Sequence, residues 1–157
     1  MSSTYPPGSE DTFGFVVHDV ARLLRKRFDQ RARALGLTRA QWQVLAHLAR
    51  NEGINQSGLA DILEIENITL GRLVDRLEES GWVERRLCGN DRRVRLLHLT
   101  EKAKPILGRM QALGLETRAE ALSGLSAEDQ ATLLNMLRHV RANLSERDVA
   151  REVRAHG

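Results

Sequence analysis

Residues 56–99, QSGLADILEIENITLGRLVDRLEESGWVERRLCGNDRRVRLLHL, decide the fold of this chain. They predict a short helix, a turn, a longer helix that ends at Ser80, and then a two-stranded hairpin. Gly81 follows the longer helix, at a position where glycine commonly ends a helix. Two helices joined by a tight turn and followed directly by a hairpin are typical of a winged helix-turn-helix. We therefore expect a mainly α fold with one small β-hairpin.

The longer helix has two unlike faces. Its apolar stripe, which we expect to be buried, consists of Leu70, Leu73, Val74 and Leu77. The opposite face includes Arg72 and Arg76, and arginine makes bidentate hydrogen bonds to guanine or pairs with phosphate. Asn67 and Thr69, near the start of the helix, are candidates for contact with phosphate or a thymine methyl. Asn67 is also the expected N-cap of this helix.

Positive charge is concentrated in the hairpin, where residues 82–98 hold five arginines against Glu84 and Asp91. An arginine at the tip can enter a narrow minor groove, so Arg92 and Arg93 are candidate DNA contacts. We expect the carboxylate of Asp91 to orient the guanidinium of Arg93. The arginines on the strands, which we expect to meet phosphates, are Arg85, Arg86 and Arg95.

Both groups of arginines also have a plainer interpretation. Arg72 and Arg76 could form surface ion pairs with Asp75, Glu78 or Glu79, and the tip could be an ordinary basic turn. The functional alternative is a winged helix that serves as a protein–protein interaction module without DNA binding. The acidic residues that favour this alternative are Glu64, Glu66, Asp75, Glu78 and Glu79.

The helices outside this stretch are long and amphipathic. Residues 12–35 predict one helix with Gly36 at its end, and Thr38 to Gln41 form a capping-box pattern for a second helix. Two further helices are expected from residue 101 and residue 126, the first bent near Pro105. We divide the chain into a flexible tail (1–10), an N-terminal dimerisation helix (11–36), a DNA-binding domain (37–99) and C-terminal dimerisation helices (100–157). A winged helix of about 65 residues does not need all these helices to bury its own core, so we expect a homodimer.

The composition fits this interpretation. The 157 residues carry a formal net charge of +3 and a pI near 9.6, which suits an anionic partner without requiring one. The single cysteine, Cys88, excludes an intrachain disulfide. No signal peptide and no membrane-spanning stretch are expected, so we predict a cytoplasmic protein with no membrane partner.

Two segments resemble a known family. LADILEIENITLGRLVDRLEESGWVERR (59–86) and DRRVRLLHLTEKA (91–103) are similar to the MarR family of bacterial transcriptional regulators. The Glu64-Ile65-Glu66 run, LCGNDRR and LTEKAKPIL resemble its SlyA branch most. The resemblance implies a homodimer with interlocked outer helices that binds pseudopalindromic promoter DNA. It places Arg72 and Arg76 in the major groove and Arg93 in the minor groove, and it implies a small, often aromatic and anionic effector that loosens DNA binding.

Other candidate sites are weaker. His18 could line an effector pocket with Trp42 as an apolar wall, an expectation that rests mainly on the resemblance, and the alternative is ordinary packing. Some MarR relatives sense peroxide through a cysteine near the start of the first helix, but residues 12–20 contain none. Cys88 at a strand end could be oxidisable, or simply a small residue there. The five histidines show no metal-ligand spacing, and no glycine-rich phosphate loop or nucleophile elbow occurs, so we predict no metal, no cofactor and no enzyme.

Overall fold

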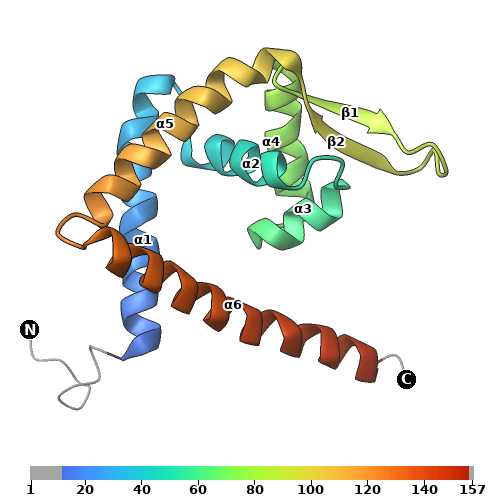
Figure 1. Ribbon diagram of the computed structural model, residues 1–157. Helices are drawn as coiled ribbons and strands as arrows, with labels where there is room; N and C mark the ends of the chain where they lie inside the picture. The colour runs from blue at the N-terminus through green and yellow to red at the C-terminus, as the bar shows by residue number, and fades with distance from the viewer. Residues whose placement is uncertain (1–11, 156–157) are drawn as a thin grey trace, which may run out of the picture. The chain divides into compact units, whose positions relative to one another are not determined.

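The computed structural model describes residues 12–155, with side chains through residue 145. The predicted tail of residues 1–10 lies outside the described residues. The elements in chain order are α1 (Phe13–Ala32), α2 (Arg39–Arg50), α3 (Gln56–Leu63), α4 (Asn67–Glu79), β1 (Val83–Leu87), β2 (Arg95–Leu99), α5 (Lys104–Ala121) and α6 (Ala127–Ala155) (Figure 1). The mainly α fold with one small hairpin is confirmed. The chain forms two compact units, which divide between Thr117 and Arg118.

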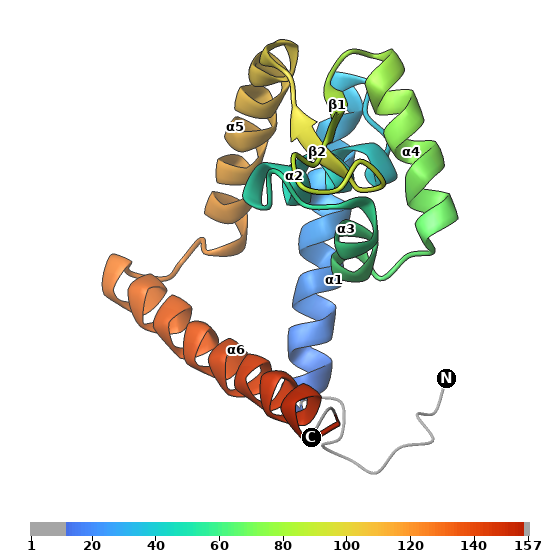
Figure 2. The ribbon, with the colours of Figure 1, turned by 90° about the vertical axis from the view of Figure 1, so that its right-hand side faces the viewer.

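The core of the first unit lies among α2, α3, α4 and the hairpin. Its largest fully buried side chains are Leu45, Leu48, Leu59, Leu70, Leu77, Leu97, Val44, Val74 and Val83. The predicted apolar stripe of α4 is confirmed, because Leu70, Val74 and Leu77 are fully buried. Figures 1 and 2 show the hairpin extending outward from this group of helices. The spacing of Leu59, Ile62 and Leu63 predicts that all three face inward, but Ile62 is exposed on α3.

Side-chain caps explain where α2 and α3 begin. Thr38 Oγ1 accepts a hydrogen bond of 3.2 Å from the Gln41 amide, and Gln41 Oε1 accepts one of 3.0 Å from the Thr38 amide, which confirms the capping box. Asn55 begins α3, because its Oδ1 accepts a bond of 2.7 Å from the Gly58 amide. Asn67 was expected to cap α4, but Glu66 holds the N-cap position and Asn67 is the first helical residue.

The hairpin forms as predicted. β1 and β2 pair antiparallel from Val83↔Leu99 to Leu87↔Arg95. The sequence gives only slight support for a very short third strand at Ile54, and the structure has a single bridge there, between Asn55 and Leu96. Backbone bonds from Leu97 N to Ile54 O and from Gly53 N to Leu97 O, each 2.9 Å, tie this segment to β2.

The two ends of α1 differ in burial. Ala32 is fully buried and Phe28 packs against the core, whereas Val17, Val20 and Leu24 are exposed. A 3-10 turn at Arg33–Leu35 follows the helix, and Gly36 adopts the predicted left-handed conformation with φ of 73°. Only the C-terminal third of the predicted apolar stripe is therefore used inside this unit.

The start of α5 corrects the expected bend at Pro105. A 3-10 turn at Glu101–Ala103 comes first, and α5 begins at Lys104. Pro105 therefore lies in the first turn of the helix. Backbone amides in this turn have no partner within the helix, so the amide hydrogen that proline lacks is not needed. The Thr100 hydroxyl donates a hydrogen bond to the Gly81 carbonyl oxygen, which joins the start of this segment to the end of α4. None of the described helices is both long enough and apolar enough to cross a membrane.

The second unit contains α6. Ser126 Oγ accepts a hydrogen bond of 3.1 Å from the Asp129 amide, which fixes the start of the helix at the predicted place. Its large apolar side chains are exposed: Leu133, Leu134, Met136, Leu137 and Leu144.

Candidate nucleic-acid interface

The outer face of α4 presents two arginines to solvent. Burial of Leu70, Val74 and Leu77 fixes the rotation of the helix, so Arg72 and Arg76 point away from the core. Among the described residues, neither guanidinium has an ion pair or a hydrogen bond to another side chain. The plainer interpretation, in which these arginines pair with neighbouring carboxylates, is therefore not what the structure shows.

Two of those carboxylates, on Asp75 and Glu78, pair with Arg85 instead. From β1, its guanidinium pairs with Asp75 Oδ1 at 2.7 Å and with Glu78 Oε1 at 3.1 Å. Its amide donates to Glu78 Oε2 at 3.1 Å, and Nη2 donates to the Gly71 carbonyl oxygen at 3.3 Å. The side chain is only 21% exposed. In the protein without DNA, the Arg85 guanidinium is therefore bound to α4 and does not project freely toward solvent.

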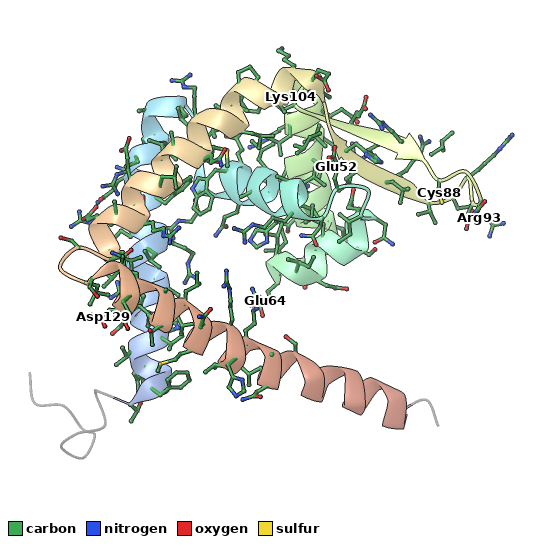
Figure 3. The ribbon with its side chains drawn as sticks, in the orientation of Figure 1. Glu52, Glu64, Cys88, Arg93, Lys104 and Asp129 are labelled. Atoms are coloured by element: carbon green, nitrogen blue, oxygen red, sulfur yellow. The ribbon has the colours of Figure 1, made fainter. Side chains whose placement is uncertain are left out.

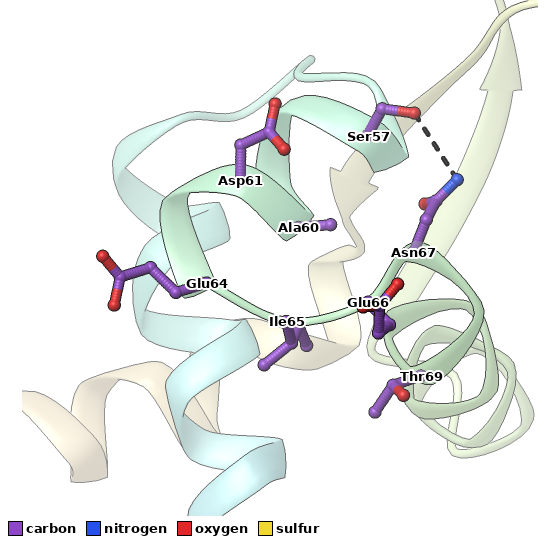
Figure 4. Close-up of a pocket in the computed structure, with 8 residues that line it drawn as sticks. All are labelled: Ser57, Ala60, Asp61, Glu64, Ile65, Glu66, Asn67 and Thr69. Carbon is purple, nitrogen blue, oxygen red and sulfur yellow. Dashed lines mark hydrogen bonds between the residues drawn. The ribbon is translucent and has the colours of Figure 1, made fainter.

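Gln56 joins α3, α4 and the hairpin, and sequence reasoning missed it. Its Nε2 donates to Asn67 Oδ1 at 3.0 Å and to the Asn67 carbonyl oxygen at 3.2 Å, while Oε1 accepts from Arg85 Nη2 at 3.5 Å. Asn67 Nδ2 in turn donates to Ser57 Oγ at 3.5 Å (Figure 4). The Asn67 amide thus holds α3 against α4.

A glycine makes this junction possible. A Cβ atom on Gly71 would lie 3.1 Å from Gln56 Nε2, closer than most real Cβ contacts. A side chain at this position would require the Gln56 amide to shift by a few tenths of an ångström. The only sequence signal for the junction is a glycine in the middle of a helix, where this residue costs stability.

Two hydrogen bonds made by Asp91 shape the hairpin tip. Asp91 Oδ1 accepts a hydrogen bond of 2.9 Å from the Arg93 amide, and the Val94 amide donates to the Asp91 carbonyl oxygen at 3.1 Å. Asp91 therefore fixes the turn, which corrects the expectation that it orients the Arg93 guanidinium. Figure 3 shows Arg93 at the outer end of the hairpin, with Cys88 close to it.

The remaining hairpin arginines differ in their surroundings. Arg92, Arg93 and Arg95 are exposed, and in the described part of the chain none of them pairs with a carboxylate. Arg86 is 57% exposed, but its guanidinium pairs with Glu84, with Nε at 2.7 Å from Oε1. The excess positive charge of the hairpin therefore lies at its tip and on β2.

The turn between α3 and α4 borders a groove of about 820 Å³. It is lined by Ser57, Ala60, Asp61, Glu64, Ile65, Glu66, Asn67 and Thr69 (Figure 4). Its three carboxylates, at Asp61, Glu64 and Glu66, disfavour phosphate or any other anion there. Within the described part of the chain, no group of His, Cys, Asp and Glu side chains could hold a metal ion.

Trp42, expected as the apolar wall of an effector pocket beside His18, is packed inside the first unit. Trp42 packs against Phe28 with ring centroids 4.5 Å apart, and its indole Nε1 donates to Asp29 Oδ1 at 3.3 Å. His18 is exposed on α1, ten residues before Phe28, which is about 15 Å along a helix. The alternative of ordinary packing is confirmed for Trp42.

Comparisons with known proteins agree with this geometry. Residues 35–94 match the sequence pattern of the MarR family. A crystal structure of the transcriptional regulator PA3341 is 35% identical, with a TM-score of 0.75, and the match covers 86% of this chain and 99% of that one. A mutant MarR from E. coli in complex with operator DNA is 30% identical, with a TM-score of 0.66, covering 81% of this chain and 91% of that one. The transcriptional regulator SlyA is 28% identical, with a TM-score of 0.69, covering 83% and 92%.

The likeness extends well beyond the winged helix, to most of the length of each chain compared. It includes regulators of both types that the resemblance named, MarR and SlyA. The chain belongs to the MarR family of transcriptional regulators.

Proposed function

We propose that this protein binds pseudopalindromic promoter DNA as a homodimer and reads its sequence with α4, the recognition helix. The observation that carries the proposal is which charged side chains on the outer face of α4 are paired and which are not. Arg72 and Arg76 are exposed and unpaired among the described residues, while Arg85 neutralises Asp75 and Glu78. Two arginines one helical turn apart, with Asp75 and Glu78 neutralised, suit bidentate contacts to guanine in the major groove.

The hairpin supplies the second part of the proposed contact. Arg92 and Arg93 at its exposed tip suit a narrow minor groove, where A·T-rich DNA has an enhanced negative potential. Arg86 and Arg95, which are both exposed, suit phosphates. Asp91 contributes by fixing the turn on which Arg93 stands.

The homodimer is supported by two apolar surfaces, one in each unit. In the first unit, α1 exposes Val16, Val17, Val20 and Leu23. In the second unit, α6 exposes Leu133, Leu134, Met136 and Leu137. Surfaces of this kind on a water-exposed helix indicate a protein partner, and a second copy is the simplest one. Two recognition helices would then enter successive major grooves about 34 Å apart.

A small-molecule effector stays a prediction from the family resemblance. The acidic groove at the α3–α4 turn does not favour an anionic effector, and Trp42 is already packed against Phe28. The proposal therefore assigns no residue to effector binding.

Selection from a random duplex library, followed by sequencing, tests the proposal. We expect an enriched motif with two-fold symmetry and half-sites one helical turn apart. Affinity for random duplex should fall steeply as salt rises, because phosphate contacts release counterions. A protein–protein module would enrich no motif and would bind random duplex, if at all, without this salt dependence.

The minor-groove part has its own test on the selected motif. Wild-type protein should prefer A·T-rich to G·C-rich sequence at the positions under the hairpin tip. Arg93→Ala should remove that preference and leave the guanine preference in place. Arg50→Ala, at an exposed arginine at the end of α2, is a matched control that should change neither preference. If Arg93→Ala left the A·T preference intact, the tip would not be the minor-groove contact.

A further inference from the structure

Ile68 stands in an unusual environment for an isoleucine. Its side chain is 75% exposed, more than any other large hydrophobic side chain in the described part of the chain. It is the second residue of α4, and the N-terminal residues of a recognition helix are the ones that reach base edges. The position thus combines full exposure with the end of the helix that is proposed to enter the groove.

Helical geometry places Ile68 in line with the two arginines. Arg72 lies one turn further along α4 and Arg76 two turns further, on the face opposite the buried Leu70 and Val74. Ile68 therefore belongs to the surface that is proposed to face the DNA bases. The apolar surfaces that the proposed homodimer would bury belong to α1 and α6, so they give no reason for an isoleucine here.

The two residues that flank Ile68 in the chain, Asn67 and Thr69, are polar, so Ile68 is the apolar side chain at this end of the α4 face. Asn67 is tied to Gln56 and Ser57, so its amide is not available for a base edge. Thr69 follows Ile68 and is exposed beside the acidic groove. Among the groups that base pairs present in the major groove, only the C5-methyl of thymine is apolar. An exposed isoleucine on this helix face is chemically matched to that methyl.

We propose that Ile68 recognises the C5-methyl of one thymine in each half-site, close to the guanine that Arg72 binds. This inference rests on the proposed DNA-binding function and adds a base to the sequence it reads. Ile68 and Arg72 are four positions apart, which is about 6 Å along the helix, and base pairs are stacked about 3.4 Å apart. The thymine therefore lies within about two base pairs of the guanine.

Deoxyuridine tests the contact directly, because it differs from thymine only by the missing methyl. Each symmetry-related pair of thymines in the selected motif is replaced in turn by deoxyuridine, and binding of the full chain is measured by fluorescence anisotropy. One pair should weaken binding by about fourfold for each half-site, the value of one methyl group removed from an apolar contact. Replacing the other thymine pairs should leave the dissociation constant nearly unchanged.

Variants then assign the effect to Ile68. Ile68→Ala should bind the thymine motif more weakly and should no longer distinguish thymine from deoxyuridine at that pair. Ile68→Val, which keeps a branched apolar side chain, should retain most of the discrimination. Ile62→Ala is the matched control, because Ile62 is also an exposed isoleucine but lies on α3. It should show the wild-type deoxyuridine effect, and circular dichroism should show all three variants folded.

Three outcomes would overturn the inference. One is a motif in which no thymine methyl matters, and another is an Ile68→Ala variant with the full wild-type deoxyuridine effect. The third is a change of oligomeric state in Ile68→Ala on size-exclusion chromatography, which would place Ile68 at a protein interface. If the selection itself enriched no motif, the proposed function would fail and the inference with it. An enriched motif without a methyl effect would remove the inference alone.

Discussion

The recognition helix and the hairpin both present arginines, but they hold them by different means. The opposite face of α4 is fully buried at Leu70, Val74 and Leu77, so the core fixes where its arginines point. The hairpin tip has no such anchor, and backbone hydrogen bonds around Asp91 and Val94 give it its shape. The difference teaches that the helix is suited to reading bases at fixed positions, whereas the tip is suited to following the DNA backbone and minor groove.

Arg85 crosses the boundary between these two regions. It belongs to β1, yet three of the residues that it contacts, Gly71, Asp75 and Glu78, lie on α4. The hairpin therefore acts on the helix even without DNA, because Arg85 neutralises two carboxylates beside the arginines that we propose to read bases. Separating the two regions by mutation should consequently give different signatures in affinity, specificity, salt dependence and stability.

The largest effect on DNA binding is expected from Arg72→Ala. Loss of a bidentate pair of hydrogen bonds to guanine should cost about 1–3 kcal/mol for each half-site and relax the preference at that base. Anisotropy titrations on the selected motif and on a motif with the guanine replaced would measure both quantities. Unchanged affinity together with unchanged preference would show that α4 does not read the DNA at this position.

The next effect is expected from Arg85→Ala, and it should appear first in stability. Removing the guanidinium breaks ion pairs to two exposed carboxylates, on Asp75 and Glu78, and a hydrogen bond to the Gly71 carbonyl oxygen, so we expect a loss of about 1–2 kcal/mol. Chemical denaturation would measure it, with Arg86→Ala as the control on the same strand. DNA affinity should also fall, but the salt slope should stay nearly constant, because Arg85 meets no phosphate in this interpretation.

A rescue experiment separates the two consequences of losing Arg85. Adding Asp75→Asn and Glu78→Gln to Arg85→Ala removes the exposed negative charge without restoring the ion pairs. DNA affinity should recover in part, whereas stability should not. If Arg85→Ala instead reduced the salt slope and left stability unchanged, Arg85 would be a phosphate contact after all.

A smaller effect is expected from Arg95→Ala. Its exposed guanidinium lacks a carboxylate partner among the described residues, so it suits a phosphate. Binding should weaken by a similar factor on every sequence, and the slope of log K against log salt should fall by about 1 for each phosphate that is no longer neutralised. A change in base preference without a change in slope would contradict the phosphate assignment.

The smallest effect is expected from Asp91→Ala. It removes one exposed hydrogen bond that shapes the tip, worth about 0.5–1 kcal/mol at most. Asp91→Asn keeps an oxygen that can accept the bond from the Arg93 amide and should bind like the wild type. A large loss with Asp91→Asn would mean that the charge of Asp91, and not its acceptor geometry, is what the tip requires.

Much of the fold could be predicted because its signals are local. The buried face of α4 follows from spacing within one helix, and the hairpin follows from two short β-forming runs separated by a turn. Gly36 and the Thr38 capping box are set by residues at most three positions apart. These features depend on near neighbours, and the structure confirms each of them.

The site residues were harder to predict where a partner comes from another element. Arg85 looked like any basic strand residue, because Asp75 and Glu78 reach it only after the hairpin folds back on α4. Asn67 looked like a helix cap, but its side-chain oxygen accepts a hydrogen bond from Gln56, eleven residues earlier in the chain. Trp42 looked available for a ligand, but in the folded chain Phe28 and Asp29 lie against it. The spacing of residues along the sequence does not show such contacts between different elements.

Gly71 divides the recognition helix into positions that are free to change and positions that are not. Gln56 and Arg85 support the helix from behind and meet at this glycine, where a side chain would crowd the Gln56 amide. Positions 68, 72 and 76 have no share in that junction. A redesign of the protein toward a different operator could therefore vary these three positions while keeping Gly71, Gln56 and Arg85. In such a library, new DNA specificities would arise without refolding the module that presents them.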